Sequence, residues 1–341
     1  MMVHTYAWII WLISGLVVIT TTRNPLIILL VDLILLIIHI WISPNPKSTI
    51  KLFMRFSLSV LALSTILNMF ISRFGKTVLF TIPTNIPLLG GNFTLEAMVY
   101  GFTNGLILIG MFTLFMILNK VVAVHSLVRL IPQAFQPVAV VTTIAITFIP
   151  ASQKQFQAIR DAQAIRGQQL KKIRDWLPLI IPLLIGGLER AMQIAEAMTA
   201  RGFTAQTERK TSYYEKALLP VGLALIMIGW MMELSVQITI SGWWLIGLGL
   251  FALLVLFFLS GRRVKKSVYA EEPWNAASGW ITVASVLMLL VFILRLPGHP
   301  SLLYDPYPAF EMPGFPMLQG LASLVLFIPV LFIKGGSDDQ D

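Results

Sequence analysis

Several features are scarce or missing in this chain of 341 residues. It has no cysteine, so disulfide bonds, thiol catalysis and cysteine-ligated metal sites are excluded. Only 12% of its residues are charged, whereas soluble globular proteins have about 25%. None of the four histidines has a second histidine at helical spacing, which argues against a catalytic metal. No cluster typical of hydrolases is present either, so we expect neither an enzyme nor a cofactor.

Apolar sequence, in contrast, is abundant. The chain is 57% hydrophobic, and its mean hydropathy is +0.81. A membrane-spanning helix needs about 20 mostly apolar residues, and eight segments approach or reach that length. We therefore predict an all-α, polytopic helical membrane protein with about eight transmembrane helices. The predicted spans are 5–22, 25–43, 54–72, 93–119, 217–235, 242–260, 276–294 and 318–333. The first of them lacks a basic leader and a cleavage site, so we expect it to be retained.

Lysine and arginine are distributed unevenly between the predicted loops. With the amino terminus inside, the inner segments carry 21 of these residues and the outer segments carry 4. Inner loops of membrane proteins have such an excess, so we expect both termini to be cytoplasmic. The uncharged stretch 130–153 could be a ninth span. Because only twelve residues separate Pro137 from Pro150, we interpret 121–150 as apolar helix at or under the inner membrane face.

The one long polar stretch, 151–216, contains two predicted helices with similar ends. The first covers about 151–166 and the second about 176–201, and an arginine followed by glycine closes each. Glycine is a common helix terminator, and a basic residue in the last turn favours the helix dipole by about 0.3–1 kcal/mol. Helix capping alone therefore accounts for either pair. Two such ends in one basic insert also favour two arginines that dock in acidic pockets of a partner present in two copies.

Three sequence stretches resemble a known family. DAQAIRG (161–167) and IAEAMTARGF (194–203) are similar to the paired arginine motifs of the transmembrane T component of energy-coupling factor (ECF) transporters, the CbiQ-like family. FTLEAMVYG (93–101) resembles the segment at the start of that family's fourth span. The resemblance covers about residues 1–240, whereas 242–341 depart from the family pattern. It implies a non-enzymatic scaffold that joins two ABC ATPases to a substrate-binding membrane protein, the S component.

The resemblance also implies roles for individual residues and segments. The residues implied for ATPase coupling are Ala164, Arg166, Gly167, Ala200, Arg201 and Gly202. Possible contacts with the S component or the bundle interior are Asp32, Glu96, Tyr100 and Gly101. The expected domains are a four-span bundle (1–120), the coupling helices (121–216), a fifth span (217–240) and further spans of unassigned role (241–341). The expected location is the cytoplasmic membrane of a prokaryote, and the expected function is uptake of a vitamin or a metal ion. We expect contact with the lipid bilayer and no binding of nucleic acid.

A second function class stays open at this point. Ionisable residues inside membrane spans are functional candidates, so Asp32, Glu96 or Glu233 could serve a proton-coupled secondary transporter. Asp32 and His39 are seven residues apart and share a helix face. Such transporters often have internal repeats, and we find none in this sequence. The fourth span also has glycines at 101, 105 and 110, which allow an S component or a neighbouring helix to approach closely.

Overall fold

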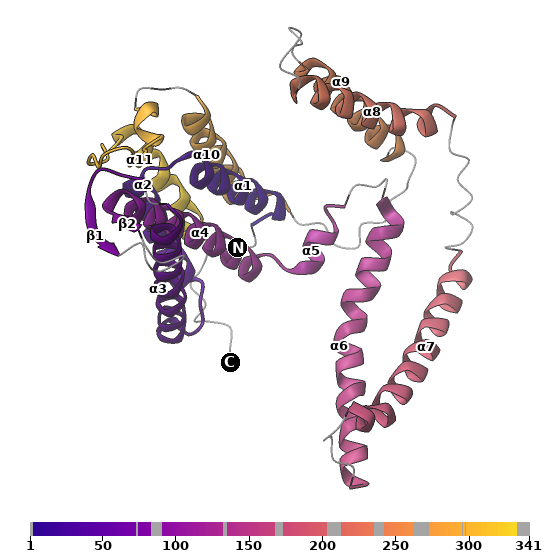
Figure 1. Ribbon diagram of the computed structural model, residues 1–341. Helices are drawn as coiled ribbons and strands as arrows, with labels where there is room; N and C mark the ends of the chain where they lie inside the picture. The colour runs from indigo at the N-terminus through magenta and orange to yellow at the C-terminus, as the bar shows by residue number, and fades with distance from the viewer. Residues whose placement is uncertain are drawn as a thin grey trace. The chain divides into compact units, whose positions relative to one another are not determined.

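A computed structural model describes residues 3–72, 74–82, 91–131, 135–167, 173–202, 213–234, 242–261, 273–294, 296 and 298–332. Helices form most of this part of the chain, together with one short β-hairpin (Figure 1). The chain divides into two compact units. Residues 1–126 and 270–341 form the first unit, and residues 127–269 form the second. Each unit has its own packing, so the two are described in turn.

The first unit contains the helices nearest the two ends of the chain. Its longer helices are α1 (Thr5–Thr21), α2 (Pro25–Trp41), α3 (Pro46–Ile71), α4 (Leu95–Val121) and α10 (Ala276–Ile293). Its shorter elements are β1 (Val78–Ile82), β2 (Gly91–Thr94), η4 (His299–Leu302), α11 (Met317–Ser323) and η5 (Leu324–Leu331). The strands pair antiparallel between α3 and α4, and the ring of Phe80 stacks on that of Phe93 at 4.6 Å. The short helix α5 (Val124–Val128) lies at the boundary between the units.

Local signals explain where the first two helices begin. His4 and Asn24 accept hydrogen bonds from the backbone N–H groups of Tyr6 and Leu26, at 3.2 and 3.0 Å. These bonds satisfy donors that the start of a helix leaves unpaired. Pro25 stands in the first turn of α2, where the missing N–H of proline does no harm. The sequence thus defines the short connection between α1 and α2.

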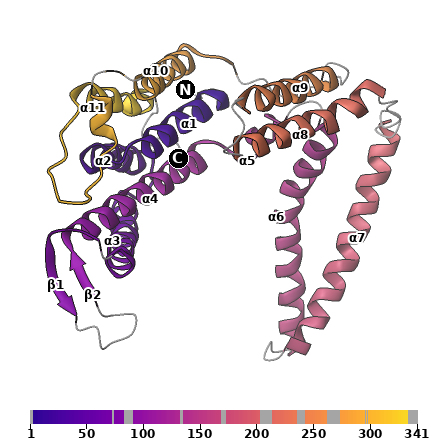
Figure 2. The same cartoon turned by 45° about the horizontal axis from the view of Figure 1, so that its top comes forward.

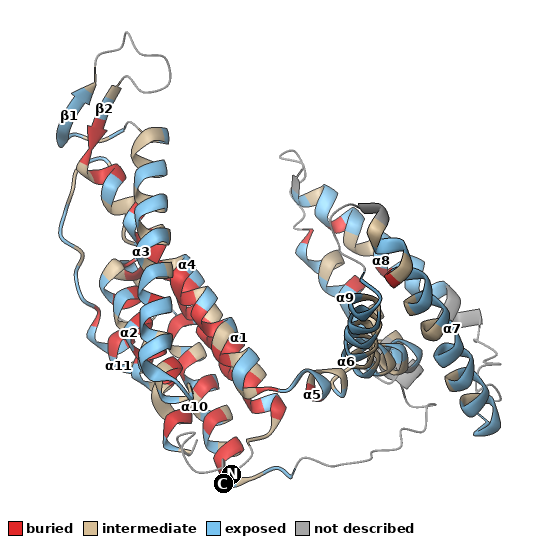
Figure 3. Ribbon diagram, turned by 90° about the horizontal axis from the view of Figure 1, so that it is seen from below, coloured by how far each residue is buried: buried red, intermediate tan, exposed pale blue. Residues whose placement is uncertain are grey.

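The carboxyl-terminal elements pack against the amino-terminal helices. α10 lies along α1, and η5 and α11 contact α2, so that buried faces meet in the middle of the unit (Figure 3). The buried indole of Trp11 donates a hydrogen bond to the carbonyl of Leu326 at 3.1 Å. Asn24 Nδ2 donates to the carbonyls of Ser301 and Gly314 at 2.9 and 2.7 Å. The described residues between 273 and 332, which are part of the segment 241–341 that the sequence left without a role, therefore contribute to the core of the first unit.

Glycines on α4 allow neighbouring helices to approach closely. A Cβ atom at Gly101 would lie 2.7 Å from Asn68 Cβ and 2.8 Å from Thr65 Cα, both on α3. A Cβ atom at Gly110 would lie 2.9 Å from the side chain of Ile19 on α1. The sequence left open whether an external partner or a helix of this chain covers these glycines. In the structure, helices of the same unit cover both positions.

The second unit consists of two helical hairpins. Its elements are α6 (Gln136–Ile165), η2 (Ile173–Trp176), α7 (Leu177–Ala200), α8 (Tyr213–Leu234) and α9 (Trp243–Gly261). In the α8–α9 hairpin, glycines of the two helices face each other. A Cβ atom at Gly229 would lie 2.8 Å from the carbonyl oxygen of Gly242, and one at Gly249 would lie 2.7 Å from that of Gly222. Small residues of this kind bring helices together inside membranes.

The prediction of an all-α, polytopic membrane protein is confirmed, and each of the eight predicted spans coincides with helical structure. Among the described residues, four helices are long and apolar enough to cross a membrane, namely α3, α4, α7 and α10. Shorter apolar helices are α1, α2, α11 with η5, and the described parts of α8 and α9. Length and composition alone therefore do not fix the number of spans. α7 also belongs to the insert for which the excess of lysine and arginine predicts a cytoplasmic location.

The predicted start of the first insert helix was wrong. We expected a helix from about 151, but α6 begins at Gln136 and runs through Pro150 without a break. Pro137 stands in the first turn, where proline is tolerated. Pro150 removes one internal hydrogen bond, which the remaining turns of a 30-residue helix offset. The apolar residues 136–150 and the polar residues 151–165 thus form a single rigid element.

Candidate functional site

The carboxyl-terminal end of α6 has a defined geometry. Arg166 caps the helix with φ −77° and ψ 5°, and Gly167 follows in the left-handed conformation with φ 80°. The N–H of Gly167 donates a hydrogen bond to the carbonyl of Ala164 at 2.9 Å. This bond satisfies one of the carbonyls that the end of a helix leaves unpaired. The arginine is thereby held at the point where the chain leaves the helix.

The end of α7 repeats this geometry. Arg201 caps the helix with φ −84° and ψ 5°, and Gly202 follows with φ 75°. The N–H of Gly202 donates to the carbonyl of Thr199 at 2.9 Å. The φ and ψ angles of the two arginines agree within 7°, and the φ angles of the two glycines agree within 5°. Two helix ends far apart in the sequence therefore present an arginine in the same way.

Both glycines are needed for their backbone conformation. Apart from the chain neighbours, no atom of the described residues lies within 4 Å of a Cβ atom built on Gly167 or Gly202, so crowding by described residues is not the reason for glycine. A left-handed φ costs other residues roughly 1–2 kcal/mol because the Cβ atom approaches the backbone. The glycine therefore fixes the direction in which each helix end, and the arginine on it, is presented.

The arginines and their neighbours are accessible. Arg166 and Arg201 are exposed, as are Ala164 and Ala200 in the last turn of each helix. Among the described residues, no carboxylate forms an ion pair with either arginine. Each guanidinium group is therefore planar, exposed and without an acidic partner in the described chain, and its five N–H donors can bind a carboxylate.

α6 and α7 run antiparallel, so the two arginines lie at opposite ends of the hairpin (Figure 2). The guanidinium of Arg190 on α7 lies 5.8 Å from the ring centre of Phe148 on α6. From that crossing, α6 continues for about 27 Å to Arg166, and α7 continues in the other direction for about 16 Å to Arg201. On the order of 40 Å of helix thus separates the two ends. One small pocket cannot receive both.

The hairpin leaves much apolar surface uncovered. Its two helices meet where Phe156 stacks near Trp176, with ring centres 6.4 Å apart, and where Gln155 lies over Gly186. Away from these contacts, large apolar side chains are exposed on both helices. They are Val138, Val141, Ile149, Ile165, Leu177, Ile180, Ile181, Leu184, Ile185, Leu188 and Met192. Exposed apolar patches of this size mark contacts with a membrane or another protein.

The structure places Asp32 inside the helical bundle. Its side chain is 8% exposed and faces Gly110 of α4, and neither carboxylate oxygen has a hydrogen-bond partner among the described residues. His39 is buried on the same face of α2, as the spacing of the two residues predicted. It contacts a residue that the sequence gave no reason to select, because Lys120 Nζ lies 3.4 Å from His39 Nε2. Only the fold brings that lysine, 81 positions later, to the histidine.

Glu96 and the residues near it take part in contacts within the first unit. One carboxylate oxygen of the fully buried Glu96 accepts a hydrogen bond from the backbone N–H of Thr77 at 3.0 Å. This bond ties the segment before β1 to the start of α4. The ring of Tyr100 lies 5.8 Å from that of Tyr307. The carbonyl of Gly101 accepts a hydrogen bond from Ser64 Oγ at 2.8 Å, within the α3–α4 contact.

Glu233 has a capping position in the second unit. Its carboxylate accepts hydrogen bonds from the backbone N–H of Gly242 and from the indole of Trp243, both at 3.1 Å, where α9 begins. Asp32 and Glu96 are also separated, because about 21 Å of α4 lies between Glu96 and Gly110, which faces Asp32. Within the first unit, the carboxylates of Asp32 and Glu96 are therefore not neighbours.

Comparisons with known proteins show which proteins this chain resembles. A family model described as "Cobalt transport protein" (CbiQ) matches residues 4–213, a range that includes both arginine ends. The chain is 35% identical over 96 residues to the energy-coupling factor transporter transmembrane protein EcfT of Leuconostoc gelidum subsp. gasicomitatum, covering 26% of this chain and 36% of that protein.

Further relatives carry the same name. The EcfT protein of Staphylococcus aureus is 35% identical over 81 residues, covering 22% of this chain and 30% of the relative. That of Lacticaseibacillus paracasei is 31% identical over 123 residues, covering 31% and 46%. The chain thus spans between 30 and 46% of the length of these three relatives.

Proposed function

Because the chain belongs to the CbiQ family of cobalt transport proteins, we propose that it is the membrane-embedded coupling subunit of an energy-coupling factor importer. The observation that carries this proposal is the matched pair of helix ends on α6 and α7. The names of the relatives support it, since they describe transmembrane proteins of energy-coupling factor transporters. In this role the chain hydrolyses no ATP itself and transmits the motion of ATPases to a substrate-binding membrane protein.

Each arginine would dock in an acidic groove of one cytoplasmic ATPase. Guanidinium groups bind carboxylates through two parallel hydrogen bonds, which fixes the orientation of the helix end as well as its position. Because on the order of 40 Å of helix separates Arg166 from Arg201, we propose two ATPase subunits, one at each end of the hairpin. A movement of one ATPase relative to the other would then change the angle between α6 and α7.

The apolar surface of the hairpin could transmit this change of angle to neighbouring molecules. We propose that the exposed apolar faces of α6 and α7 lie against the inner side of the bilayer and the S component. This places the hairpin in the cytoplasm with both termini of the chain, as the 21-to-4 distribution of basic residues favours. The S component would select the substrate, which we expect to be a vitamin or a metal ion.

Site-specific crosslinking tests the proposal. Because the chain has no cysteine, Ala164→Cys and Ala200→Cys each introduce a single thiol beside one of the two arginines. Both positions are exposed. We expect both to crosslink to an ATPase expressed from a gene adjacent to that of this chain. Met312→Cys, in the first unit and 86% exposed, is the control and should not react. Failure of both alanine positions to crosslink would contradict the proposal.

A further inference from the structure

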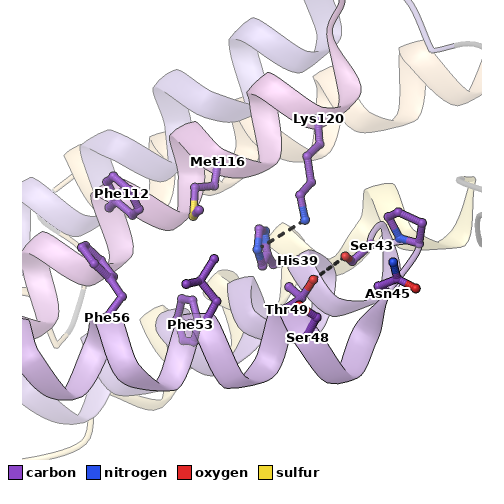
Figure 4. A pocket seen from close by; sticks show the side chains of 12 residues that line it. His39, Ser43, Asn45, Ser48, Thr49, Phe53, Phe56, Phe112, Met116 and Lys120 are labelled. Carbon is purple, nitrogen blue, oxygen red and sulfur yellow. Dashed lines mark hydrogen bonds between the residues drawn. The ribbon is translucent and has the colours of Figure 1, made fainter. Parts of the chain in front are cut away.

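A cavity of about 340 Å³ lies in the first unit, where α2 and α4 end and α3 begins (Figure 4). It includes the contact between His39 and Lys120 and lies apart from the arginine ends of α6 and α7. One wall is polar and basic, and the other is aromatic. The volume is at the lower end of the range of small-molecule sites, which is about 300–1,000 Å³.

The polar wall has hydrogen-bond donors but no carboxylate that accepts from them among the described lining residues. Lys120 reaches across to His39, and one of the three ammonium hydrogens is used there. The His39 side chain is 2% exposed, and its Nδ1 has no hydrogen-bond partner among the described residues. Ser43 and Thr49 add two hydroxyl groups, whose oxygens lie 2.5 Å apart. The described residues that line the cavity include no aspartate or glutamate, so this wall favours an anion.

The start of α3 adds to this preference. Asn45 and Ser48 line the cavity, and the N-cap residue Asn45 makes no side-chain hydrogen bond to the first turn of the helix. The first N–H groups of a helix have no partner within it and bind anions, phosphate groups among them. The lysine, the buried histidine and the helix start therefore converge on the same polar wall.

The opposite wall is suited to a hydrocarbon chain. It consists of Phe53, Phe56, Phe112 and Met116 from α3 and α4 (Figure 4). The rings of Phe56 and Phe112 are stacked, with centres 4.4 Å apart. An inorganic anion would leave this aromatic surface unused, and a neutral apolar molecule would leave the donors unpaired. The two walls together match an anionic amphiphile.

The expected position of the cavity across the bilayer also fits an anionic amphiphile. α3 has 26 residues and α4 has 27, so each is about 40 Å long. The hydrocarbon core of a bilayer is about 30 Å thick, and about 40–45 Å with the headgroup regions. The ends of these two helices therefore reach the level of the lipid headgroups. The cavity lies at those ends.

We propose that this cavity binds an anionic phospholipid, with the phosphate at Lys120, His39 and the start of α3, and one acyl chain against Phe56 and Phe112. A volume of about 340 Å³ accommodates the phosphate region and the first part of one chain. This site does not depend on the coupling function proposed above, because it lies outside the α6–α7 hairpin.

Native mass spectrometry of the full chain in detergent tests the proposal. We expect phosphatidylglycerol to bind at least tenfold more tightly than phosphatidylcholine, because the second lipid carries a compensating positive charge. Glycerol phosphate, which has the anionic group without the acyl chains, should not compete at a hundredfold excess. Equal binding of the two lipids, or competition by glycerol phosphate, would overturn the proposal without any variant being needed.

Two lysine variants locate the site. Lys120→Gln should weaken phosphatidylglycerol binding about tenfold, and Lys120→Arg should leave it within about threefold. Lys51→Gln is the matched control, because Lys51 is exposed on the first turns of α3 and does not line the cavity. It should change binding by less than about threefold. Equal losses in Lys120→Gln and Lys51→Gln would show that lipid binds to basic residues in general, and the proposed site would be wrong.

Discussion

The two units of the molecule differ in how far they cover their own apolar residues. In the first unit, Trp8 and Trp11 of α1 and Phe292 of α10 are almost completely buried. Among the described apolar side chains of the second unit, only Leu179 is buried. Of the residues in the most apolar window, 50% are buried in α4 and 39% in α10, but only 6% in α3 of the first unit and 6% in α7 of the second. The first unit therefore has a buried core, although its helix α3 stays largely exposed, whereas the described apolar side chains of the second unit are left for a bilayer or other proteins to cover.

Under the proposed coupling role, this difference gives the two units different tasks. A bundle with its own buried core can keep its shape while the ATPases move. A hairpin with few internal contacts can change its angle without disrupting a core. The two arginine ends lie on that hairpin. We therefore expect substitutions in the first unit to affect folding, and substitutions at the hairpin ends to affect attachment and transport.

The largest effect on stability is expected for Trp11→Ala. The substitution leaves a cavity in the first unit and removes the hydrogen bond to Leu326, so the free energy of unfolding should fall by about 3 kcal/mol or more. The matched control is Trp244→Ala on α9, since Trp244 is 83% exposed. Thermal unfolding in detergent should separate the two variants clearly. Equal melting temperatures would show that the two units do not differ as described.

A smaller effect is expected for Gly101→Ala. The added Cβ atom would meet backbone and side-chain atoms of α3, so helix packing should lose about 1–3 kcal/mol. Gly247→Ala on α9 is the control, because no atom lies within 4 Å of its Cβ position. That variant should be neutral or slightly stabilising, since alanine favours helix by about 1 kcal/mol over glycine. The same melting experiment measures both, and destabilisation by Gly247→Ala alone would contradict the packing.

Substitution of Gly202 should change function more than stability. Gly202→Ala strains the left-handed position by roughly 1 kcal/mol and should redirect the end of α7, while the melting temperature stays nearly unchanged. Gly202→Asn should behave like the natural chain, because asparagine tolerates that conformation. ATP-dependent uptake in cells is the measurement. If the alanine and asparagine variants transport equally well, the direction of the helix end is unimportant.

The smallest effect is expected for Asp32→Asn. The carboxylate has no hydrogen-bond partner among the described residues, and asparagine keeps its shape without its charge. We expect stability within about 1 kcal/mol of the natural chain and normal uptake. Loss of uptake in a fully assembled complex would instead favour the proton-coupled alternative and would assign Asp32 a charge-dependent role.

The sequence predicted best what depends on neighbouring residues. The positions of the apolar helices and the Arg-Gly ends of α6 and α7 follow from hydropathy and from glycine's backbone freedom, which are local properties. The continuation of α6 through Pro150 was missed because the energy of the remaining turns outweighs one lost hydrogen bond.

Contacts between residues far apart in the sequence could not be predicted from hydropathy and motifs. The contact of Trp11 with Leu326 joins residues 315 positions apart, and nothing near either residue indicates it. The meeting of Lys120 with His39 is of the same kind, since it depends on how α2 and α4 cross. The hydrogen bonds of Glu233 at the start of α9 also depend on the fold, because the sequence does not show how α8 and α9 meet.

The most direct test of the central claim replaces both arginines of the hairpin. Removal of one partner of a buried charged pair typically costs about 2–5 kcal/mol, whereas an exposed pair is worth at most about 1 kcal/mol. Arg166→Ala with Arg201→Ala should therefore abolish co-purification of the ATPases, while the membrane unit stays folded. Arg160→Ala, exposed on α6 and away from the helix end, is the control and should keep them bound. If the double variant retains the ATPases as well as Arg160→Ala does, the two arginines only cap their helices, and the coupling role is wrong.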